Sequence, residues 1–313
     1  MTKTALLFPG QGSQYVGMGK DLAETYPEAR EVFDKADELL GFELSKICFE
    51  GPDTELNRTD VSQPAILTHS WAVVAALRAQ KSGREILDGA GVAAGLSLGE
   101  YSALAAAGAM AWEDAVKLVR ARGQYMQEAC DAKPSTMASI VGLDDDKLAE
   151  AIKPAQESGI VVLANFNAPG QVAISGEVAA VEMAMKLAKE AGAKLAVPLT
   201  VAGAFHSPLM EPAQERLAAQ IETTTFHSPR IGVIANVDAE EYSDPATLKA
   251  NLVRQLTSPV RWANSMQKLV EWEYDNFIEL GPGTVLAGLL KRVARSATRT
   301  SVGTVEEIES LVK

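Results

Sequence analysis

The segment Gly95–Gly99 has the pattern Gly-x-Ser-x-Gly, whose residue types could present Ser97 for attack on a carbonyl carbon. In a nucleophile elbow, such a serine occupies a sharp, strained turn between a strand and a helix. The turn leaves no room for side chains two positions on either side of the serine, and glycine stands at both positions here. A short apolar strand is predicted over residues 92–94 and a helix over residues 100–107. The sequence therefore predicts Ser97 as a nucleophile, with an ordinary Gly-Ser turn at the start of a helix as the alternative.

A serine nucleophile needs a general base, and the chain has three histidines. His69 lies in the middle of a helix predicted over residues 64–79, where a buried structural histidine is expected. His227 lies in a polar run before a strand, which predicts a solvent-facing loop. His206 follows an apolar segment and precedes Pro208, in a loop that could reach into a site. We therefore predict His206 as the base, with an ordinary loop histidine as the alternative.

The order of these residues differs from that of an α/β-hydrolase, in which an acid lies between the serine and a histidine near the C-terminus. No histidine follows His227 in this chain. The third group could instead be a backbone carbonyl left without a partner at the C-terminus of a helix, which accepts the imidazole N–H. The helix expected to end near Gln255 offers such a carbonyl.

The elements that must position these residues alternate between strands and helices, which predicts an α/β fold with a parallel sheet. The chain opens with a strand over residues 4–8 that breaks at Pro9 and Gly10. Further elements of this body are helices over 20–25, 27–40, 64–79 (with Pro64 in its first turn), 112–129, 211–221, 246–255 and 261–271, and strands over 231–236 and 277–280.

The middle of the chain has a different pattern. Strands predicted over 137–143, 160–165, 171–175 and 195–199 combine with helices over 145–156 and 178–191 in the order βαββαβ. That order is typical of a split, ferredoxin-like unit. We therefore predict an α/β-hydrolase-like body, residues 1–128 and 200–313, with a ferredoxin-like subdomain inserted at 129–199.

Composition excludes several functional classes. The 313 residues contain 29 Lys and Arg against 41 Asp and Glu, and the net charge of −12 disfavours a nucleic-acid partner. Cys48 and Cys130 are too few for a disulfide framework, which favours a reducing compartment. The apolar run Ala5–Phe8 is too short for a signal peptide, and residues 103–112 cover half the length of a membrane span. We therefore expect a cytoplasmic protein with no membrane partner.

Six motifs occur in an order that resembles the malonyl-coenzyme A:acyl carrier protein transacylases. The resemblance extends from residue 4 to about residue 290. The motifs are Phe8–Gln14, Gly95–Tyr101, Arg120–Gly123, Asn165–Gln171, Ala204–Ser207 and Glu279–Gly283.

This resemblance implies a role for each matching residue. Ser97 would be the nucleophile and His206 its base, with the backbone carbonyl of Gln255 orienting the imidazole. The backbone N–H groups of Gln11 and Leu98 would form the oxyanion hole. The implied reaction is ping-pong transfer of a malonyl group from malonyl-CoA to the phosphopantetheine thiol of acyl carrier protein, without a metal or other cofactor.

Four further residues are implied in substrate binding. Arg122 would hold the malonyl carboxylate, with a surface guanidinium paired to Glu128 as the alternative. Phe205 beside the histidine would exclude an α-methyl group, so that methylmalonyl transfer is the second choice. Asn165 and Asn167 would border the site, although turn residues of this type are equally common.

One position departs from the family, because Leu96 stands where histidine is more frequent; this removes a polar neighbour of the serine but no catalytic atom. The carrier protein is usually acidic in this family, so a basic patch should guide it. The candidates are Lys291, Arg292 and Arg295, or alternatively Lys186 and Lys189.

Other functions remain open. A polyketide pathway could supply the carrier instead of fatty acid synthesis, although a free-standing chain favours the latter. A serine thioesterase would use water as the second nucleophile, and a non-catalytic docking module would retain the fold alone. A monomer is the default expectation.

Overall fold

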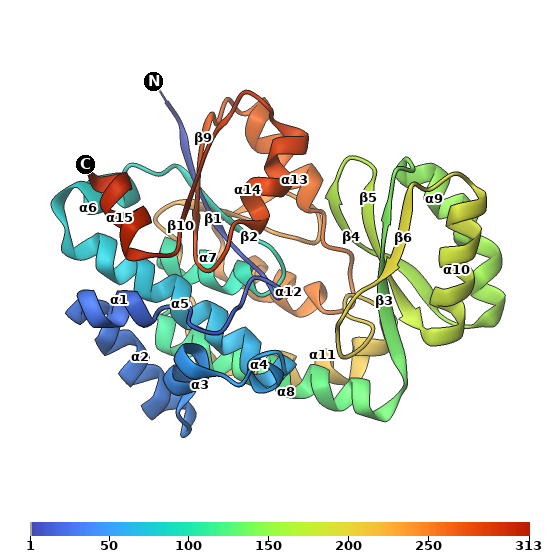
Figure 1. Cartoon of the computed structure of the whole chain (residues 1–313), viewed down its shortest axis with the longest axis horizontal. Helices are drawn as coiled ribbons and strands as arrows, with labels where there is room; N and C mark the ends of the chain where they lie inside the picture. The colour runs from blue at the N-terminus through green and yellow to red at the C-terminus, as the bar shows by residue number, and fades with distance from the viewer. Residues whose placement is uncertain (1) are drawn as a thin grey trace.

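The computed structural model describes residues 2–313 and contains two separate sheets (Figure 1). The larger sheet has six strands in the order β10-β9-β1-β2-β7-β8, and the smaller has four in the order β4-β5-β3-β6. The first sheet is parallel apart from its edge strand β8, and the second is antiparallel throughout. The predicted fold class, an α/β body with an additional ferredoxin-like unit, is confirmed.

The parallel sheet is buried on both faces. Its strands are β1 (Thr4–Phe8), β2 (Val92–Gly95), β7 (Gly232–Ile234), β8 (Glu241–Tyr242), β9 (Asn276–Leu280) and β10 (Thr298–Val302). Successive side chains of a strand point to opposite faces, so Leu6 and Phe8 pack into one hydrophobic cluster and Ala5 and Leu7 into another. Strand β2 and the turn that follows it are therefore held between two apolar layers.

Helices cover both faces of this sheet. They are α1 (Lys20–Thr25), α2 (Pro27–Leu40), α3 (Leu44–Glu50), α4 (Asp53–Leu56), α5 (Thr59–Ala79), α6 (Lys81–Asp88), α7 (Gly99–Ala107), α8 (Trp112–Ala132), α11 (Glu211–Thr223), α12 (Pro245–Gln255), α13 (Trp262–Glu271), α14 (Val285–Val293) and α15 (Val305–Val312). Helices α13 and α14 contribute Trp262, Met266 and Leu290 to the cluster on one face. No helix within residues 2–313 is long and apolar enough to cross a membrane.

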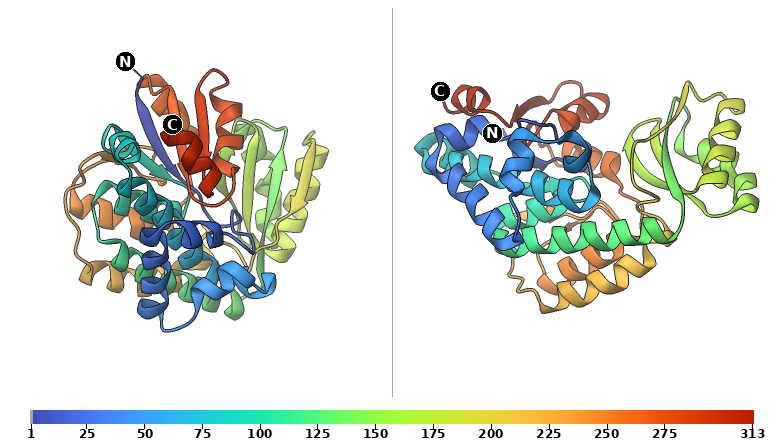
Figure 2. Two further views of the ribbon diagram at one scale, coloured as in Figure 1. Left: turned by 60° about the vertical axis from the view of Figure 1, so that its left-hand side comes forward. Right: turned by 60° about the horizontal axis from the view of Figure 1, so that its bottom comes forward.

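The antiparallel sheet has the strand order of a ferredoxin-like unit. It consists of β3 (Ser135–Val141), β4 (Val161–Ala168), β5 (Gln171–Glu177) and β6 (Leu195–Pro198), with α9 (Asp145–Ile152) and α10 (Val178–Glu190) on one face. Helix α8 runs along the body and leads directly into β3, as the right-hand view of Figure 2 shows. The division into domains at residues 129 and 199 remains a prediction.

The structure corrects the start of one helix. Pro64 does not lie in a first turn, because α5 already begins at Thr59 and contains Pro64 in its interior. Proline lacks the N–H that would bond the carbonyl four residues earlier, that of Asp60. The guanidinium of Arg120 on α8 donates to this carbonyl and to the Asp60 carboxylate. A partner on another helix therefore replaces the missing bond, and the helix continues.

Other predicted boundaries also move. The helix predicted over 145–156 ends at Ile152 and continues as a 3-10 helix, η1 (Lys153–Ser158), because Pro154 interrupts the α-helical bonding. The strand predicted over 231–236 is shorter, covering Gly232–Ile234, since the chain leaves the sheet there. Sequence analysis missed the short elements α3, α4, α6 and β8 and the C-terminal elements α14, β10 and α15. The last of these begins with a Thr304–Glu307 capping box that is readable in the sequence.

Candidate active site

The turn that carries Ser97 joins β2 to α7 and has the strained backbone expected of a nucleophile elbow. Ser97 has φ 55°, in the left-handed region that L-residues rarely adopt. A Cβ on Gly95 would lie 1.9 Å from the carbonyl oxygen of Gly99, and a Cβ on Gly99 would lie 2.2 Å from that of Phe8. Neither position accepts a side chain, which is the reason given above for the two glycines.

Ser97 and His206 are brought together although they come from distant segments. The Oγ of Ser97 lies 2.8 Å from Nε2 of His206, and Nδ1 of the same ring lies 2.9 Å from the backbone oxygen of Gln255. Gln255 is the last residue of α12, so its carbonyl has no partner within the helix. Because that carbonyl can only accept, the network assigns the proton to Nδ1 and leaves Nε2 free to take the serine proton.

The environment of His206 keeps its imidazole neutral. Burial, and then the positive charge of Arg122, lower the pKa of His206 from 6.5 to about 4. His206 itself has φ 57°, which makes it a second strained residue of this site. A neutral imidazole bonded in this way can act as a general base at neutral pH.

Arg122 lies in this site and not on the surface. It is 1% exposed, and its Nη2 donates to Ser97 Oγ (2.9 Å) and Gln255 Oε1 (3.0 Å), while Nη1 donates to Gln63 Oε1 (2.7 Å). The alternative pairing with Glu128 is wrong, because Glu128 pairs with Arg216.

Arg122 has no direct ion-pair partner, and Glu100 acts on its charge only from beyond Gln255. No carboxylate lies within 4 Å of its guanidinium in the part of the chain that the structure describes, and its Nε has no hydrogen-bond partner there. Burial lowers the pKa of Arg122, although arginine stays charged in proteins. A buried cation with neutral partners is suited to bind a carboxylate ligand.

The loop that contains Gln11 lies against the elbow. A Cβ on Gly10 would lie 2.4 Å from the carbonyl oxygen of Leu96, so the two turns approach more closely than any side chain at position 10 would allow. Within residues 2–313, neither the Gln11 N–H nor the Leu98 N–H donates to a protein acceptor. Both remain available to a ligand oxygen, as the oxyanion-hole prediction requires.

Asn236, which sequence analysis missed, supports the elbow. The Ser97 N–H donates to Asn236 Oδ1 (2.7 Å), and Asn236 Nδ2 donates to the carbonyl of Gly95 (2.7 Å). Glu100 Oε2 accepts from the Asn236 N–H (3.0 Å) and from Gln255 Nε2 (2.8 Å). The position of Asn236 at the carboxyl end of a predicted strand was the one available signal, since ligands bind at this edge of parallel sheets.

The remaining predicted residues lie at the junction of the two sheets. Phe205 is buried, and its carbonyl accepts a hydrogen bond from Ser175 on β5 (2.6 Å). Asn165 on β4 is also buried and pairs with Val260, while Asn167 is half-buried. In the described chain no hydrogen bond joins either asparagine to Ser97, His206 or Arg122. Their role at the border of the site stays a prediction.

The other two histidines lie apart from the serine. His69 is fully buried in α5, and burial lowers its pKa to about 4, as expected for a structural histidine. His227 is exposed in a loop and its backbone N–H donates to Ala109. Of the three, only His206 contacts Ser97.

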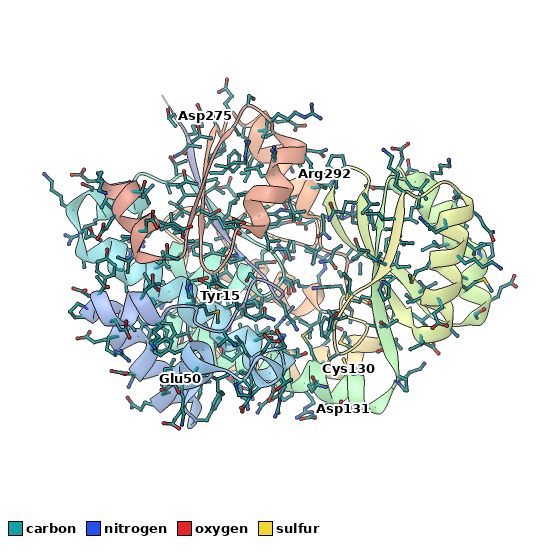
Figure 3. The ribbon with its side chains drawn as sticks, in the orientation of Figure 1. Tyr15, Glu50, Cys130, Asp131, Asp275 and Arg292 are labelled. Carbon is teal, nitrogen blue, oxygen red and sulfur yellow. The ribbon has the colours of Figure 1, made fainter. Side chains whose placement is uncertain are left out.

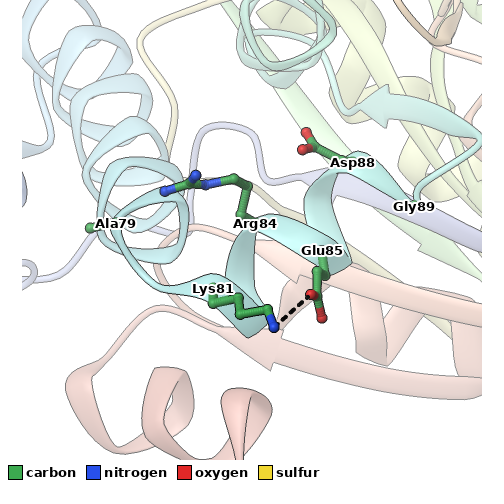
Figure 4. Close-up of a pocket in the computed structure, with 6 residues that line it drawn as sticks. All are labelled: Ala79, Lys81, Arg84, Glu85, Asp88 and Gly89. Carbon is green, nitrogen blue, oxygen red and sulfur yellow. Dashed lines mark ion pairs between the residues drawn. The ribbon is translucent and has the colours of Figure 1, made fainter.

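A surface hollow beside α6, shown in Figure 4, shares no residue with this site. Lys81 and Glu85, one turn apart on α6, form an ion pair (3.9 Å), and both side chains are exposed. Nowhere in the described residues does a group of three or more His, Cys, Asp or Glu side chains occur that could hold a metal ion. The prediction that the reaction needs no metal or cofactor stays a prediction.

An elbow serine, a buried neutral histidine and two free N–H groups at the carboxyl edge of a parallel sheet define an enzyme of serine-dependent acyl transfer. The acyl transferase domain family matches residues 5–310 of the chain. Malonyl CoA-acyl carrier protein transacylase of Bacillus subtilis is 46% identical over 100% of this chain and 97% of that protein. The protein of the same name from Haemophilus influenzae is 44% identical, over 99% and 98% respectively.

Solved structures of proteins with the same activity in their names also superpose on this chain. The malonyl CoA-acyl carrier protein transacylase of Coxiella burnetii superposes with a TM-score of 0.93 at 38% identity, covering 99% of this chain and 97% of that one. A malonyl-transacylase in complex with a type II PKS acyl-carrier protein has a TM-score of 0.94 at 38% identity, covering 99% of both chains. The chain belongs to the acyltransferase family of malonyl CoA-acyl carrier protein transacylases. The resemblance inferred from its six motifs is thereby confirmed.

Proposed function

We propose that this enzyme transfers the malonyl group of malonyl-CoA to the phosphopantetheine thiol of acyl carrier protein, through a malonyl ester on Ser97. One observation carries this proposal beyond family membership. The buried guanidinium of Arg122, which has only neutral partners, lies 2.9 Å from the nucleophilic oxygen. An acyl donor that ends in a carboxylate can supply the anionic partner that the protein does not place on this guanidinium.

In the first half-reaction, Ser97 Oγ attacks the thioester carbon while Nε2 of His206 takes the hydroxyl proton. The N–H groups of Gln11 and Leu98 hold the oxyanion of the tetrahedral intermediate. The intermediate then collapses, the carbon–sulfur bond breaks, and the imidazolium returns its proton to the departing coenzyme A thiol. The Gln255 carbonyl stabilises the imidazolium between these steps.

The second half-reaction reverses the first with a different thiol. The phosphopantetheine thiol of the carrier gives its proton to His206 and attacks the malonyl ester, and Ser97 leaves with the proton from the imidazolium. Every proton and charge in both steps is handled by Ser97, His206, backbone N–H groups and Arg122, so the mechanism calls for no metal or other cofactor.

We place the carrier on the basic patch formed by Lys291, Arg292 and Arg295. These residues line a hollow of about 570 Å³ together with Pro169. Arg292 points toward the antiparallel sheet (Figure 3) and donates to the Pro169 carbonyl (3.0 Å). None of the three cations has a carboxylate within 4 Å among the described residues, so their charge is available to an acidic partner.

The alternative patch is less suited to this role. Lys186 pairs with Glu190 (4.0 Å), and Lys189 donates to the carbonyl of Lys194 (2.9 Å). Both lie on α10, on the antiparallel sheet, and the difference from the α14 patch is the ion pair of Lys186, since Arg292 also donates to a backbone carbonyl. The α14 patch is therefore the better candidate.

We assign the reaction to fatty acid synthesis, in a monomeric cytoplasmic enzyme. Both cysteines are free and buried, which suits a reducing compartment. A polyketide carrier is the second candidate, because one structural relative was solved with such a carrier. Comparing kcat/KM for the host's fatty-acid carrier and a polyketide carrier separates the two.

Intact-mass spectrometry tests the central proposal. The wild-type protein mixed with malonyl-CoA should gain one malonyl group, and addition of carrier protein bearing its phosphopantetheine arm should remove it and yield malonyl-carrier. Ser97→Ala should gain nothing. Free malonate in place of malonyl-carrier would identify a thioesterase, and no adduct on the wild type would identify a docking module.

A further inference from the structure

Glu100 is a buried carboxylic acid for which the mechanism above has no role. It follows the elbow directly, in the first turn of α7, and is 3% exposed. No Lys or Arg side chain of the described residues lies within 4 Å of it. One oxygen, Oε2, accepts both of its hydrogen bonds, from the Asn236 N–H (3.0 Å) and from Gln255 Nε2 (2.8 Å).

The carboxylate determines which way the Gln255 amide faces. Burial raises the pKa of Glu100 to about 7, but Oε2 accepts the Asn236 N–H whether or not the group is ionised. The NH₂ group of Gln255, and not its oxygen, therefore faces this acceptor. The amide oxygen then faces Arg122, whose Nη2 donates to it (3.0 Å). With the amide reversed, its NH₂ group would face the guanidinium and two donors would oppose each other. Gln255 Nε2 also donates to the Ser97 carbonyl (3.0 Å), which favours the same direction.

Glu100 also holds Asn236, the residue behind the elbow. It accepts the Asn236 N–H, and the side chain of Asn236 bonds both the N–H of Ser97 and the carbonyl of Gly95. One buried carboxylate is therefore bonded to both residues that hold the nucleophile turn and the guanidinium. Gln255 additionally provides the carbonyl that orients His206.

We propose that Glu100 is a positioning residue that sets the preference for a carboxylate-bearing acyl donor, by fixing the Gln255 amide with its oxygen toward Arg122. The inference rests on the proposed function, in which Arg122 binds the malonyl carboxylate. Without the acceptor at position 100, the Gln255 amide can rotate, and the guanidinium loses the neutral acceptor that aims it at the substrate. Malonyl transfer then suffers more than acetyl transfer, because only malonyl uses Arg122.

Three substitutions separate the role of Glu100 as a hydrogen-bond acceptor from the roles of its charge and of its length. Glu100→Met keeps the approximate length and removes the acceptor. Glu100→Gln removes the charge but keeps an oxygen that can accept both bonds. Glu100→Asp keeps the carboxylate but shortens its reach, and it carries the test if the methionine variant does not fold. For each, kcat/KM is measured with malonyl-CoA and with acetyl-CoA, alongside the thermal unfolding midpoint.

The expected result is a change in the ratio of the two kcat/KM values. Glu100→Met should lower the malonyl-to-acetyl ratio by about 10- to 100-fold, the range expected for losing hydrogen bonds that involve charged groups. Glu100→Asp should lower it in the same direction by a smaller factor. Glu100→Gln should stay within about threefold of the wild-type ratio, since its oxygen replaces the carboxylate oxygen as acceptor.

Glu279 offers a matched control on another strand. It is equally buried, and its carboxylate accepts from the N–H groups of Leu286 (2.9 Å) and Ala287 (3.0 Å) and from Ser301 Oγ (3.0 Å). Glu279→Met removes a comparable set of bonds, so it should lower the unfolding midpoint while leaving the malonyl-to-acetyl ratio unchanged.

Two results would overturn the proposal. The first is an equal reduction of kcat/KM for malonyl-CoA and acetyl-CoA in Glu100→Met, or in Glu100→Asp if that variant is used instead. An unchanged ratio of this kind, as expected for Glu279→Met, would mean that Glu100 only stabilises the fold. The second is a fall of the malonyl-to-acetyl ratio in Glu100→Gln as large as that in Glu100→Met. The charge of Glu100, and not its role as a hydrogen-bond acceptor, would then be responsible. Failure of the wild type to form a malonyl ester would instead refute the proposed function, so the two failures are distinguishable.

Discussion

The two sheets differ in what they bury. In the antiparallel unit, residues 135–198, the core is made of aliphatic side chains such as Ile140, Leu148 and Ile174. Its only buried polar side chains are Asn165 and Ser175, and both lie where this unit meets the body. The carboxyl edge of the parallel sheet is the opposite. There the chain buries polar and charged side chains in one connected network; they are Gln63, Glu100, Arg122, His206, Asn236 and Gln255.

Buried polar groups destabilise a fold unless their hydrogen bonds are satisfied, and an aliphatic core avoids that cost. A chain that buries a network of them at one edge therefore retains it for chemistry, while the antiparallel unit serves packing. Substitutions in the polar network at the carboxyl edge should change activity far more than stability, and substitutions in the core of the antiparallel unit should do the reverse.

Ser97→Ala should have the largest effect. The hydroxyl is the nucleophile, so acyl-enzyme should be undetectable by intact-mass spectrometry with either malonyl-CoA or acetyl-CoA. The unfolding midpoint should stay close to that of the wild type, because the hydroxyl is a small part of the packing at the turn. A malonyl adduct on this variant would refute the assignment.

His206→Ala should follow, with about a 10²–10⁴-fold loss in both half-reactions, as is typical when a general base is removed. Stopped-flow measurement of ester formation and of transfer to the carrier resolves the two steps. His227→Gln is the control, since its side chain is exposed in a loop. A loss confined to one half-reaction would show that His206 does not serve both thiols.

Arg122→Ala should depress malonyl transfer by about 10²–10³-fold, because the substrate carboxylate is left buried and unpaired. Acetyl transfer should be spared or raised, so that the preference narrows or inverts. Arg122→Lys should restore only part of the rate, since a point charge cannot make two parallel bonds. An equal fall in kcat/KM for both donors would place Arg122 in a structural role.

The pH profile should show a smaller, graded effect. The pKa of His206 is lowered to about 4, first by burial and then by Arg122, and the neutral ring is the active form. Ester formation from acetyl-CoA should therefore be nearly constant above about pH 5 and fall as the pH drops through about 4. Arg122→Met removes a positive charge and should move the midpoint upward. A wild-type midpoint near 6.5, the ordinary value for histidine, would contradict the burial argument.

Ile174→Val should have the smallest effect on activity. Ile174 is fully buried on β5 in the core of the antiparallel unit. Loss of one methylene group should cost about 0.5–1.5 kcal/mol of the free energy of unfolding. Denaturant unfolding measures that cost, and kcat/KM for both acyl donors should be unchanged. A selective loss of malonyl transfer would break the division between the two regions.

The sequence predicted the parts of the site that depend on local rules. Steric demands at Gly95 and Gly99 identify the elbow, and a helix end identifies the Gln255 carbonyl. The roles of Gln63, Asn236 and Glu100 were not predictable, because these residue types are common on surfaces and acquire their partners only when distant segments meet. The alternative for Arg122 was wrong for the same reason. Its burial depends on Gly123, where a Cβ would lie 2.6 Å from the Thr59 carbonyl and would keep α8 away from α5.

Pro64 has a consequence for the evolution of the site. Its missing N–H leaves the Asp60 carbonyl to Arg120, while one residue before the proline Gln63 holds Arg122. Two arginines of α8, two residues apart, thus bond to α5 at Asp60 and Gln63, the two ends of a single turn of that helix. Positions 64 and 120 should therefore vary together among relatives. A lineage that replaced the proline would regain an intrahelical bond and leave Arg120 with only the Asp60 carboxylate as its partner on that residue. Selection for Arg120, the anchor that fixes where the neighbouring arginine reaches the serine, would then be weaker.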